Sequence, residues 1–452
     1  MTRSSRWMMS NPDASPPEGG PAGTGEPETR LYSDGAFPGV KRPVVAPVDS
    51  AAERIPGTPY LDPTTQDIAG AFRATSTDVE AFRTTFSRAS VPDCGGRYHD
   101  MGTTALLDMY SLKHPNGAVQ AAASPYWAFV WPRDNSYVVV AFALTGLYEE
   151  AWAALRYVYS VQQPDGQWEA RYLPDGSGDV PDERGRQDDG IGYTLWATWV
   201  LTRLSPRELI HQQLPYISDS IRRAVRDASD VLDSETHLPR ASQDFWEVDQ
   251  EEPSLGVSGP LLCGLRAGAD LAKWLGDHFL AQKAQEHAKK LLTAIERTFG
   301  ATGFERFPSG GGRDASLAFL LPPFLGPVDA GAHPAVAHAY QAWGLSRARM
   351  QVPNGGLRPG EKWPDATTAW NTIASLYAIT AASSGERGIA DQYLTWMDER
   401  RTRLGCLPEK VTAAGRPAAV APISTVSACV LIALSILDGY ELPIPWEERV
   451  SP

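Results

Sequence analysis

Residues 124–144 read SPYWAFVWPRDNSYVVVAFAL, and the rest of the chain is best understood from this stretch. Aromatic side chains crowd into the positions before Pro132, and an apolar run with helical spacing follows Asp134. Proline is not tolerated inside a helix and aspartate is a good helix cap, so we predict that a helix begins near Asp134. Arg133 and Asp134 would then stand at the start of that helix beside Trp131. This pattern fits a capped helix with a surface ion pair as well as the wall of a binding site.

Apolar runs with helical periodicity recur from this stretch to the end of the chain, and strand signals are few. The short segments 117–122 and 171–173 could each form part of a hairpin. The expected helices are 66–88, 98–113, 134–147, 148–163, 188–204, 213–233, 256–275, 277–299, 313–321, 332–349, 366–383, 387–403 and 424–438.

The connections between these helices alternate in length. Links such as 145–147 and 384–386 are tight, whereas 164–187, 234–255 and 404–423 are long and rich in Gly, Pro, Trp and acidic residues. Short links join antiparallel neighbours, and long loops are where functional residues gather. About a dozen helices joined in this way predict an all-α fold, an (α/α)6 barrel with its long loops at one end. An irregular helical bundle would predict no such alternation.

The ends of the chain differ from its helical part. Residues 1–29 hold little to bury and are expected to be a disordered tail. Prolines recur without periodicity over 30–64, which indicates an extended N-terminal arm, and 65–452 would form the catalytic domain. No apolar segment of a secretory signal precedes Asn11. The cysteines are far apart, which favours a cytoplasmic protein: Cys94, Cys263, Cys406 and Cys429.

Composition excludes several classes of partner. With 42% apolar and 21% charged residues, the 452-residue chain has ample material for a globular core. Its formal charge of -13 argues against nucleic acid or an anionic membrane surface as a partner. None of the 8 His has a metal-ligand spacing, and no phosphate loop or GxSxG elbow occurs, so we expect no metal or cofactor. The 14 Trp could serve a core or stack on sugar rings.

Two carboxylates on separate long loops suggest acid–base chemistry. Glu247 follows Phe245 and Trp246, and an apolar wall would raise the pKa of its carboxyl group and keep it protonated as a general acid. A surface glutamate beside a half-buried tryptophan would give the same pattern. Glu409 lies on the loop before the last apolar helix. Two such carboxylates at one rim are what glycoside hydrolysis requires.

Together these motifs resemble glycoside hydrolase family 15, the glucoamylase family. The order and rough spacing match at Trp131-Pro132-Arg133-Asp134, Gln187-x-Asp189-Gly190-x-Gly192, Trp246-Glu247 and Leu407-Pro408-Glu409, with further similarity at 117–122, 313–317 and Gly356-Leu357-Arg358. The resemblance covers roughly residues 98–438.

The resemblance implies an (α/α)6 barrel that hydrolyses α-glucosidic bonds from the non-reducing end with inversion. By position, Glu247 would be the general acid and Glu409 the base that activates water. Arg133 and Asp134 would bind hydroxyls of the terminal sugar. Trp131 would pack against that sugar, and Arg358 would lie near the leaving sugar. The other expected substrate-binding residues are Trp127, Gln187, Asp189 and Trp246. The partner would be an oligosaccharide or α-glucoside.

The chain also departs from that family. It has only an arm where bacterial relatives usually carry an N-terminal β-sandwich, and Val248 stands where fungal members have a second glutamate. Residues 422–428 read PISTVSA where the family commonly has a Pro-Leu-x-Trp-Ser segment that supports the base. Short α-glucosides such as isomaltose or trehalose are therefore as plausible as starch.

Three other functions stay open on the sequence. The altered 422–428 segment fits a non-hydrolytic sugar-binding relative, and a phosphorolytic relative is a variant of that idea. The motif Gln163-x-x-Gly166-x-Trp168 resembles one found in toroidal terpene cyclases, but it occurs in a single convincing copy and no DxDD motif accompanies it. The sequence does not indicate an oligomeric state.

Overall fold

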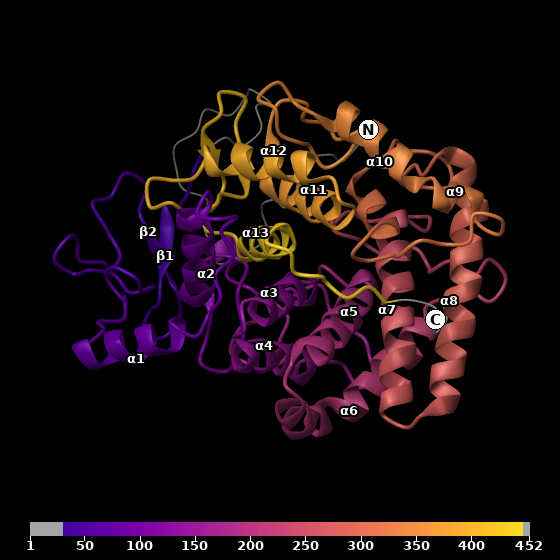
Figure 1. Ribbon diagram of the computed structural model, residues 1–452, viewed down its shortest axis with the longest axis horizontal. Helices are drawn as coiled ribbons and strands as arrows, with labels where there is room; N and C mark the ends of the chain where they lie inside the picture. Colours follow the sequence, from indigo (N-terminus) through magenta and orange to yellow (C-terminus); the bar gives the residue numbers. More distant parts are fainter. Residues whose placement is uncertain (1–29, 446–452) are drawn as a thin grey trace.

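The computed structural model describes residues 30–445, and the tail expected at 1–29 lies outside them. Figure 1 shows a mostly helical molecule with small strands near the N-terminal arm. The α-helices are α1 Ser76–Phe86, α2 His99–Leu112, α3 Pro132–Leu144, α4 Tyr148–Ser160, α5 Asp189–Leu204, α6 Arg207–Asp230, α7 Leu255–Trp274, α8 His278–Thr298, α9 Pro334–Ala337, α10 Ala339–Met350, α11 Asn371–Ser383, α12 Arg387–Asp398 and α13 Ser424–Leu437. The 3-10 helices are η1 Pro125–Trp127, η2 Gly300–Thr302 and η3 Ala315–Leu320.

Six of these elements form a closed inner ring. Each contacts the next in the order α3, α5, α7, η3, α11, α13, and α13 returns to α3. These elements are buried along almost their whole length; in α13, every residue but Ile436 is buried. Because the ring neighbours cover two sides and an outer layer covers a third, an inner helix must be apolar nearly all round.

An outer layer surrounds this ring. Helices α4, α6, α8, α10 and α12 each pack on the inner element that precedes them, and α2 covers α13. The outer helices are amphipathic: in α8, Leu280, Ala284, Leu291 and Ile295 are buried and the opposite face is exposed. Six inner and six outer elements in this order are the predicted (α/α)6 barrel.

The boundaries of several elements differ from the sequence-based expectation for local reasons. Helix α3 begins at Pro132 rather than Asp134, because proline is well accommodated at the first helical position, where its missing N–H is not needed. Helix α1 begins only at Ser76, where Thr75 and Asp78 form a reciprocal capping box. The fourth inner element, η3, is a short 3-10 helix that ends before Pro322 and Pro323.

Residues before α1 form a small layer of their own. Strands β1 Gly35–Phe37 and β2 Val44–Ala46 pair antiparallel, and Phe37, Ala46 and Leu61 belong to a small buried cluster within the arm. In Figure 1 this part lies beside α2. A second small sheet joins β3 Ala369–Trp370, β4 Lys410–Val411 and β5 Pro417–Ala418.

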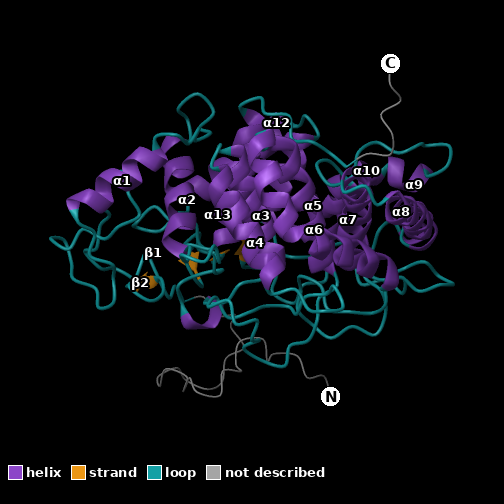
Figure 2. Cartoon of the chain, turned by 90° about the horizontal axis from the view of Figure 1, so that it is seen from below, coloured by secondary structure: helices purple, strands orange, loops and turns teal. Residues whose placement is uncertain are grey.

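The long loops gather at one end of the barrel. Figure 2 shows the strands and most of the loops beneath the helices. The inner helices begin at this end, because β3 leads directly into α11 and the loop that carries β4 and β5 leads into α13. Within residues 30–445, no helix combines the length and the apolar character needed to cross a bilayer.

Candidate active site

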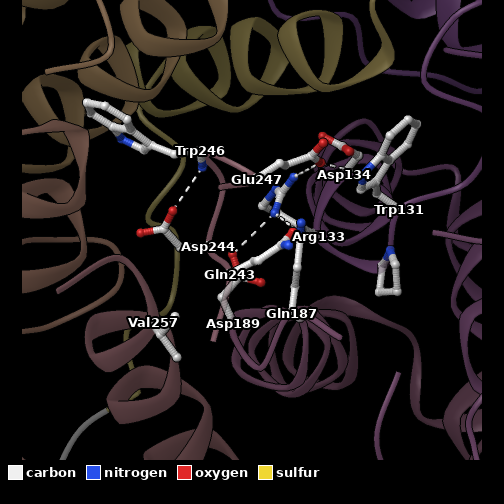
Figure 3. Close-up of polar contacts among 12 residues, drawn as sticks. Trp131, Arg133, Asp134, Gln187, Asp189, Gln243, Asp244, Trp246, Glu247 and Val257 are labelled. Carbon is white, nitrogen blue, oxygen red and sulfur yellow. Dashed lines mark hydrogen bonds and ion pairs between the residues drawn. The ribbon is translucent and has the colours of Figure 1, made fainter. Parts of the chain in front are cut away.

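Arg133 is the centre of a polar cluster at the loop end of the barrel. It lies in the first turn of α3, and its guanidinium donates to Gln187 Oε1 at 2.7 Å and to Asp189 Oδ2 at 3.2 Å. A further N–H reaches Glu247 Oε1 at 3.3 Å. Figure 3 shows Arg133 between Glu247 on one side and Gln187 and Asp189 on the other. The structure thus brings together four of the predicted site residues.

Glu247 sits on a sharp turn that aims its side chain at this cluster. Its N–H donates to Asp244 O at 2.7 Å, and its φ of 53° lies in the left-handed region that a residue with a side chain rarely adopts. Asp244 holds the turn: it is fully buried, and its Oδ1 accepts from Arg306 at 2.7 Å and from the Trp246 N–H at 2.9 Å. A strained conformation that buried contacts enforce is typical of functional sites.

The surroundings of Glu247 are charged. The Trp131 indole N–H donates to Glu247 Oε1 at 2.7 Å, Arg133 approaches the same oxygen, and Arg184 forms an ion pair with Oε2. The carboxylate oxygens therefore contact polar and charged groups, and the apolar wall expected from Phe245 and Trp246 is wrong as a description of their surroundings. Sequence reasoning missed Arg184 because it lies within the 164–187 loop, where neither periodicity nor a motif distinguishes it from its neighbours.

Two further carboxylates of the cluster are buried. Burial raises the pKa of Asp189 to about 7, although Arg133 opposes the shift. Burial also raises the pKa of Asp134, whose Oδ1 accepts a hydrogen bond from the Thr425 hydroxyl. Asp189 Oδ1 and Gln187 Nε2 are buried and have no hydrogen-bond partner within the described residues. Polar atoms left like this at a site suit a ligand rich in hydroxyl groups.

Trp246 is part of an aromatic wall that it forms with Trp363. Its ring packs edge-on against Trp363 with centroids 4.6 Å apart, and the guanidinium of Arg306 lies 3.8 Å from its centroid. Arg358 lies on the same loop as Trp363 and donates to Trp363 O at 3.4 Å. The Trp246 indole nitrogen is buried without a hydrogen-bond partner in the described part of the chain.

The two other predicted tryptophans have different surroundings. Trp131 is 6% exposed; besides its bond to Glu247, its ring is covered by Arg171, 5.1 Å from the centroid. Trp127 contacts the ring of Tyr32 at a centroid distance of 6.2 Å. It also contacts the ring of Tyr126 at a centroid distance of 6.0 Å, so both of these ring contacts lie outside the cluster around Arg133.

Glu409 is anchored by its backbone to the start of α11. Its N–H donates to Val420 O and its carbonyl accepts from the Asn371 N–H, each at 2.8 Å. The Asn371 side chain also donates to Pro408 O at 2.7 Å, and Lys410 Nζ lies 4.0 Å from Glu409 Oε2. These bonds fix the loop that carries Glu409 against the first residue of an inner helix.

Several residues of the polar cluster lie at the N-terminal ends of inner helices, at one end of the ring. Asp134 lies in the first turn of α3, Thr425 in the first turn of α13, and Asp189 is the first residue of α5. Helix N-termini carry partial positive charge and favour carboxylates nearby. The N-terminal ends of these inner helices, which carry the partial positive charge, therefore lie next to the acidic side chains.

The N-terminal arm supports the segment between Glu409 and α13. Tyr32 N–H donates to Ala419 O at 2.7 Å, and Ser33 Oγ both donates to Ala421 O at 2.8 Å and accepts from the Ala421 N–H at 3.0 Å. Thr425, in the segment that departs from the family pattern, holds Asp134. Within residues 30–445, no group of three or more His, Cys, Asp and Glu side chains is arranged to hold a metal ion.

A closed ring of six helical hairpins with carboxylates, arginines and tryptophans at one rim defines the helical-barrel class of glycoside hydrolases. The sequence matches the model of glycosyl hydrolases family 15 over residues 103–387. The chain belongs to this family. Glu247 lies within the matched residues, and Glu409 lies beyond them.

Individual relatives are distant. An uncharacterized glycosyl hydrolase of Methanocaldococcus jannaschii is 33% identical over 103 residues, which are 22% of this chain and 16% of that protein. A bacterial glucoamylase solved with acarbose superposes with a TM-score of 0.64 at 16% identity, over 81% of this chain and 59% of its own. A glycosidase variant solved with glucose has a TM-score of 0.61 at 20% identity, over 76% and 97%. At these identities the structural likeness establishes the fold alone.

Proposed function

We propose that the protein is an inverting, exo-acting glycoside hydrolase that removes a terminal α-linked glucose, with Glu247 as the general acid and Glu409 as the general base. Its substrates would include short α-glucosides such as isomaltose or trehalose. The observation that carries this proposal is that Arg133 and Asp134 lie side by side in one helical turn. Arg133 is bonded to Glu247. Asp134 is bonded to Thr425, which lies near the Glu409 loop. The ligands of two structural relatives, acarbose and glucose, agree with a glucose-type substrate.

The chemistry follows from the arrangement. Arg133 and Asp134 present a donor and an acceptor that suit neighbouring hydroxyls of a terminal sugar, and the unpartnered Gln187 Nε2 and Asp189 Oδ1 suit two more polar groups. Glu247 would give its proton to the glycosidic oxygen as the bond to the leaving sugar breaks. Glu409 would take a proton from the water that attacks the opposite face of the ring. One water molecule is consumed, and the anomeric centre inverts.

Substitution of each carboxylate tests the assignment. Glu247→Gln and Glu409→Gln should each lower kcat at least about 10²-fold on whichever of maltose, isomaltose and trehalose the unchanged protein cleaves fastest, since general acid–base catalysis contributes about that much or more. Glu399→Gln is the control, because Glu399 is exposed and pairs with Arg400. The glucose that water attacks should appear first as the β-anomer in NMR, whereas trehalose would also release its other glucose as the α-anomer. Full turnover by both active-site variants would defeat the assignment, and formation of no β-anomer in the first turnovers would defeat inversion.

The second candidate is a sugar-binding protein without hydrolytic activity. It is favoured by the 422–428 segment, which lacks the Trp and Ser of the family pattern, and by the two arginines that hold Glu247. Calorimetry would distinguish the two. Tight glucose or disaccharide binding, together with no hydrolysis of any disaccharide in the panel, would support binding alone.

A further inference from the structure

Both oxygens of the Glu247 carboxylate are occupied. Oε1 accepts from the Trp131 indole N–H at 2.7 Å and from Arg133 at 3.3 Å, and Oε2 is paired with Arg184. A general acid needs one oxygen free to meet the glycosidic oxygen, and that oxygen must carry a proton. Two guanidinium groups favour the ionised carboxylate. The carboxylate in this structure is therefore ready neither to touch the substrate nor to protonate it.

The donors on Oε1 are fixed in the barrel. Trp131 is buried at the start of α3, and Arg133 is bonded to Gln187 and Asp189 as well as to Glu247. Neither can leave without stranding buried polar groups, which is costly. Oε2 is thus the oxygen that must face a substrate, and Arg184 stands where the glycosidic oxygen and the leaving sugar would lie.

Arg184 is held far less firmly than Arg133. It lies on the 164–187 loop, outside any helix or strand, and its second partner is Asp182, 3.6 Å away. Burial and the neighbouring charges of Arg171 and Arg133 lower the pKa of Arg184 to about 10, which means that its charged form is poorly accommodated there. Asp182, on the same loop, is paired through Oδ2 with Arg171, but its Oδ1 is buried and has no hydrogen-bond partner in the described part of the chain. This oxygen can accept Arg184 when Glu247 is released.

We propose that Arg184 is a residue of the leaving-group site: the leaving sugar displaces it from Glu247 Oε2 onto Asp182, and its departure allows Glu247 to take up a proton from solvent. This inference rests on the proposed role of Glu247. Arg184 stays protonated throughout, and the proton that Glu247 gains passes to the leaving oxygen. Glu247 is then protonated only when a leaving sugar occupies its site. Substrates whose leaving group cannot displace Arg184 are turned over poorly.

The proposal predicts a difference between two pH profiles. The charged groups paired with Glu247 are Arg133 from α3 and Arg184 from the loop. Asp189 of α5 pairs with Arg133, and Asp182, which also pairs with Arg171, lies next to Arg184. In the free enzyme Arg184 favours ionised Glu247, so the alkaline limb of kcat/KM lies at low pH. In the substrate complex Arg184 has left, so the alkaline limb of kcat lies higher.

The test is Arg184→Gln, with Arg186→Gln as the matched control. Arg186 is on the same loop but pairs with Asp165 and Glu169. Arg184→Gln should move the alkaline limb of kcat/KM up by about one pH unit or more, the usual effect of a nearby opposite charge, and leave the limb of kcat in place. The control should move neither limb. Arg184→Lys keeps the positive charge, so its alkaline limb of kcat/KM should lie close to that of the unchanged protein.

Several outcomes would overturn the proposal. Unchanged limbs in Arg184→Gln would show that Arg184 does not control the acid, and equal movement of both limbs would show that Arg184 stays on Glu247 in the complex. Asp182→Asn removes the alternative partner and should raise KM several-fold; an unchanged KM would contradict the proposed displacement. If instead Glu247→Gln keeps full turnover, it is the proposed function that fails, so the two failures are distinguishable.

Discussion

Arg306 is the residue on which the Glu247 turn depends. Its side chain is 2% exposed, donates to Asp244 at 2.7 Å, lies 3.8 Å from Asp314 Oδ2 and covers the ring of Trp246. Burial raises the pKa of Asp314 to about 6, and Arg306 opposes the shift. One guanidinium thus compensates two buried carboxylates directly behind the candidate acid.

Arg306→Leu should therefore destabilise the protein strongly. Removing one partner of a buried ion pair leaves the other charge uncompensated, which costs about 3–5 kcal/mol. Urea denaturation followed by tryptophan fluorescence would measure the loss. Arg226→Leu is the control, because Arg226 is exposed and lies 4.0 Å from Asp277; it should change the free energy of unfolding by less than about 0.5 kcal/mol. Equal effects of the two substitutions would contradict this account of the turn.

At the scale of elements, the inner ring depends on close approach between α5 and α7. A Cβ atom at Gly192 would lie 2.2 Å from Pro260 O, and one at Gly264 would lie 2.5 Å from the Gly192 Cα. Both contacts are with backbone atoms, which cannot move aside as a flexible side chain can. The Gly190-x-Gly192 part of the family motif therefore serves packing at Gly192, next to the binding residues at the start of α5.

Gly192→Ala tests this packing. It should lower the free energy of unfolding by about 1–3 kcal/mol or more, because overpacking forces backbone shifts. Gly344→Ala is the matched control: Gly344 lies in α10 and a Cβ there would meet nothing within 4 Å. That variant should gain up to about 1 kcal/mol, since alanine is the better helix former. Thermal unfolding of both variants would measure these changes. An unchanged free energy of unfolding in Gly192→Ala would show that the two helices can move apart without cost.

Over the whole molecule, the N-terminal arm ties together distant parts of the chain. Ser33 and Ala421 exchange two hydrogen bonds although 388 positions separate them. Arg54 pairs with buried Asp108 at 2.5 Å, and Arg403 pairs with Glu53 at 2.6 Å. The loop that carries Glu409 is therefore held on one side by α11 and on the other by the arm.

Ser33→Ala should loosen that loop specifically. It leaves the buried N–H and carbonyl of Ala421 without their partner, at a cost of about 1–3 kcal/mol. Hydrogen exchange should be faster at Ala421 than in the unchanged protein, while amides in α7, on the far side of the ring, keep their protection. Ser33→Thr, which retains the hydroxyl, should behave like the unchanged protein. Uniformly faster exchange over the barrel would show that Ser33 has only a global effect on stability.

Much of the fold follows from the sequence because it depends on local rules. Apolar runs such as 424–438 and the alternation of short and long links are properties of neighbouring residues, and they predicted the helices and the (α/α)6 barrel. The short η3 and the start of α3 at Pro132 were predicted less well, because a few residues at a boundary carry a weak signal. The predicted roles of Glu247 and Glu409 remain proposals, yet both residues lie on long loops as their sequence context indicated.

The sequence by itself determined the helical architecture, the family and which side chains are candidates for the site. Only the tertiary structure decided what those side chains touch: that Trp131 donates to Glu247, that Arg184 pairs with the same carboxylate, and that the arm supports the Glu409 loop. The physical reason is one of range. Helix periodicity is set by residues a few positions apart, whereas the charge and hydrogen bonding around a carboxylate are set by loops that meet only when the ring closes.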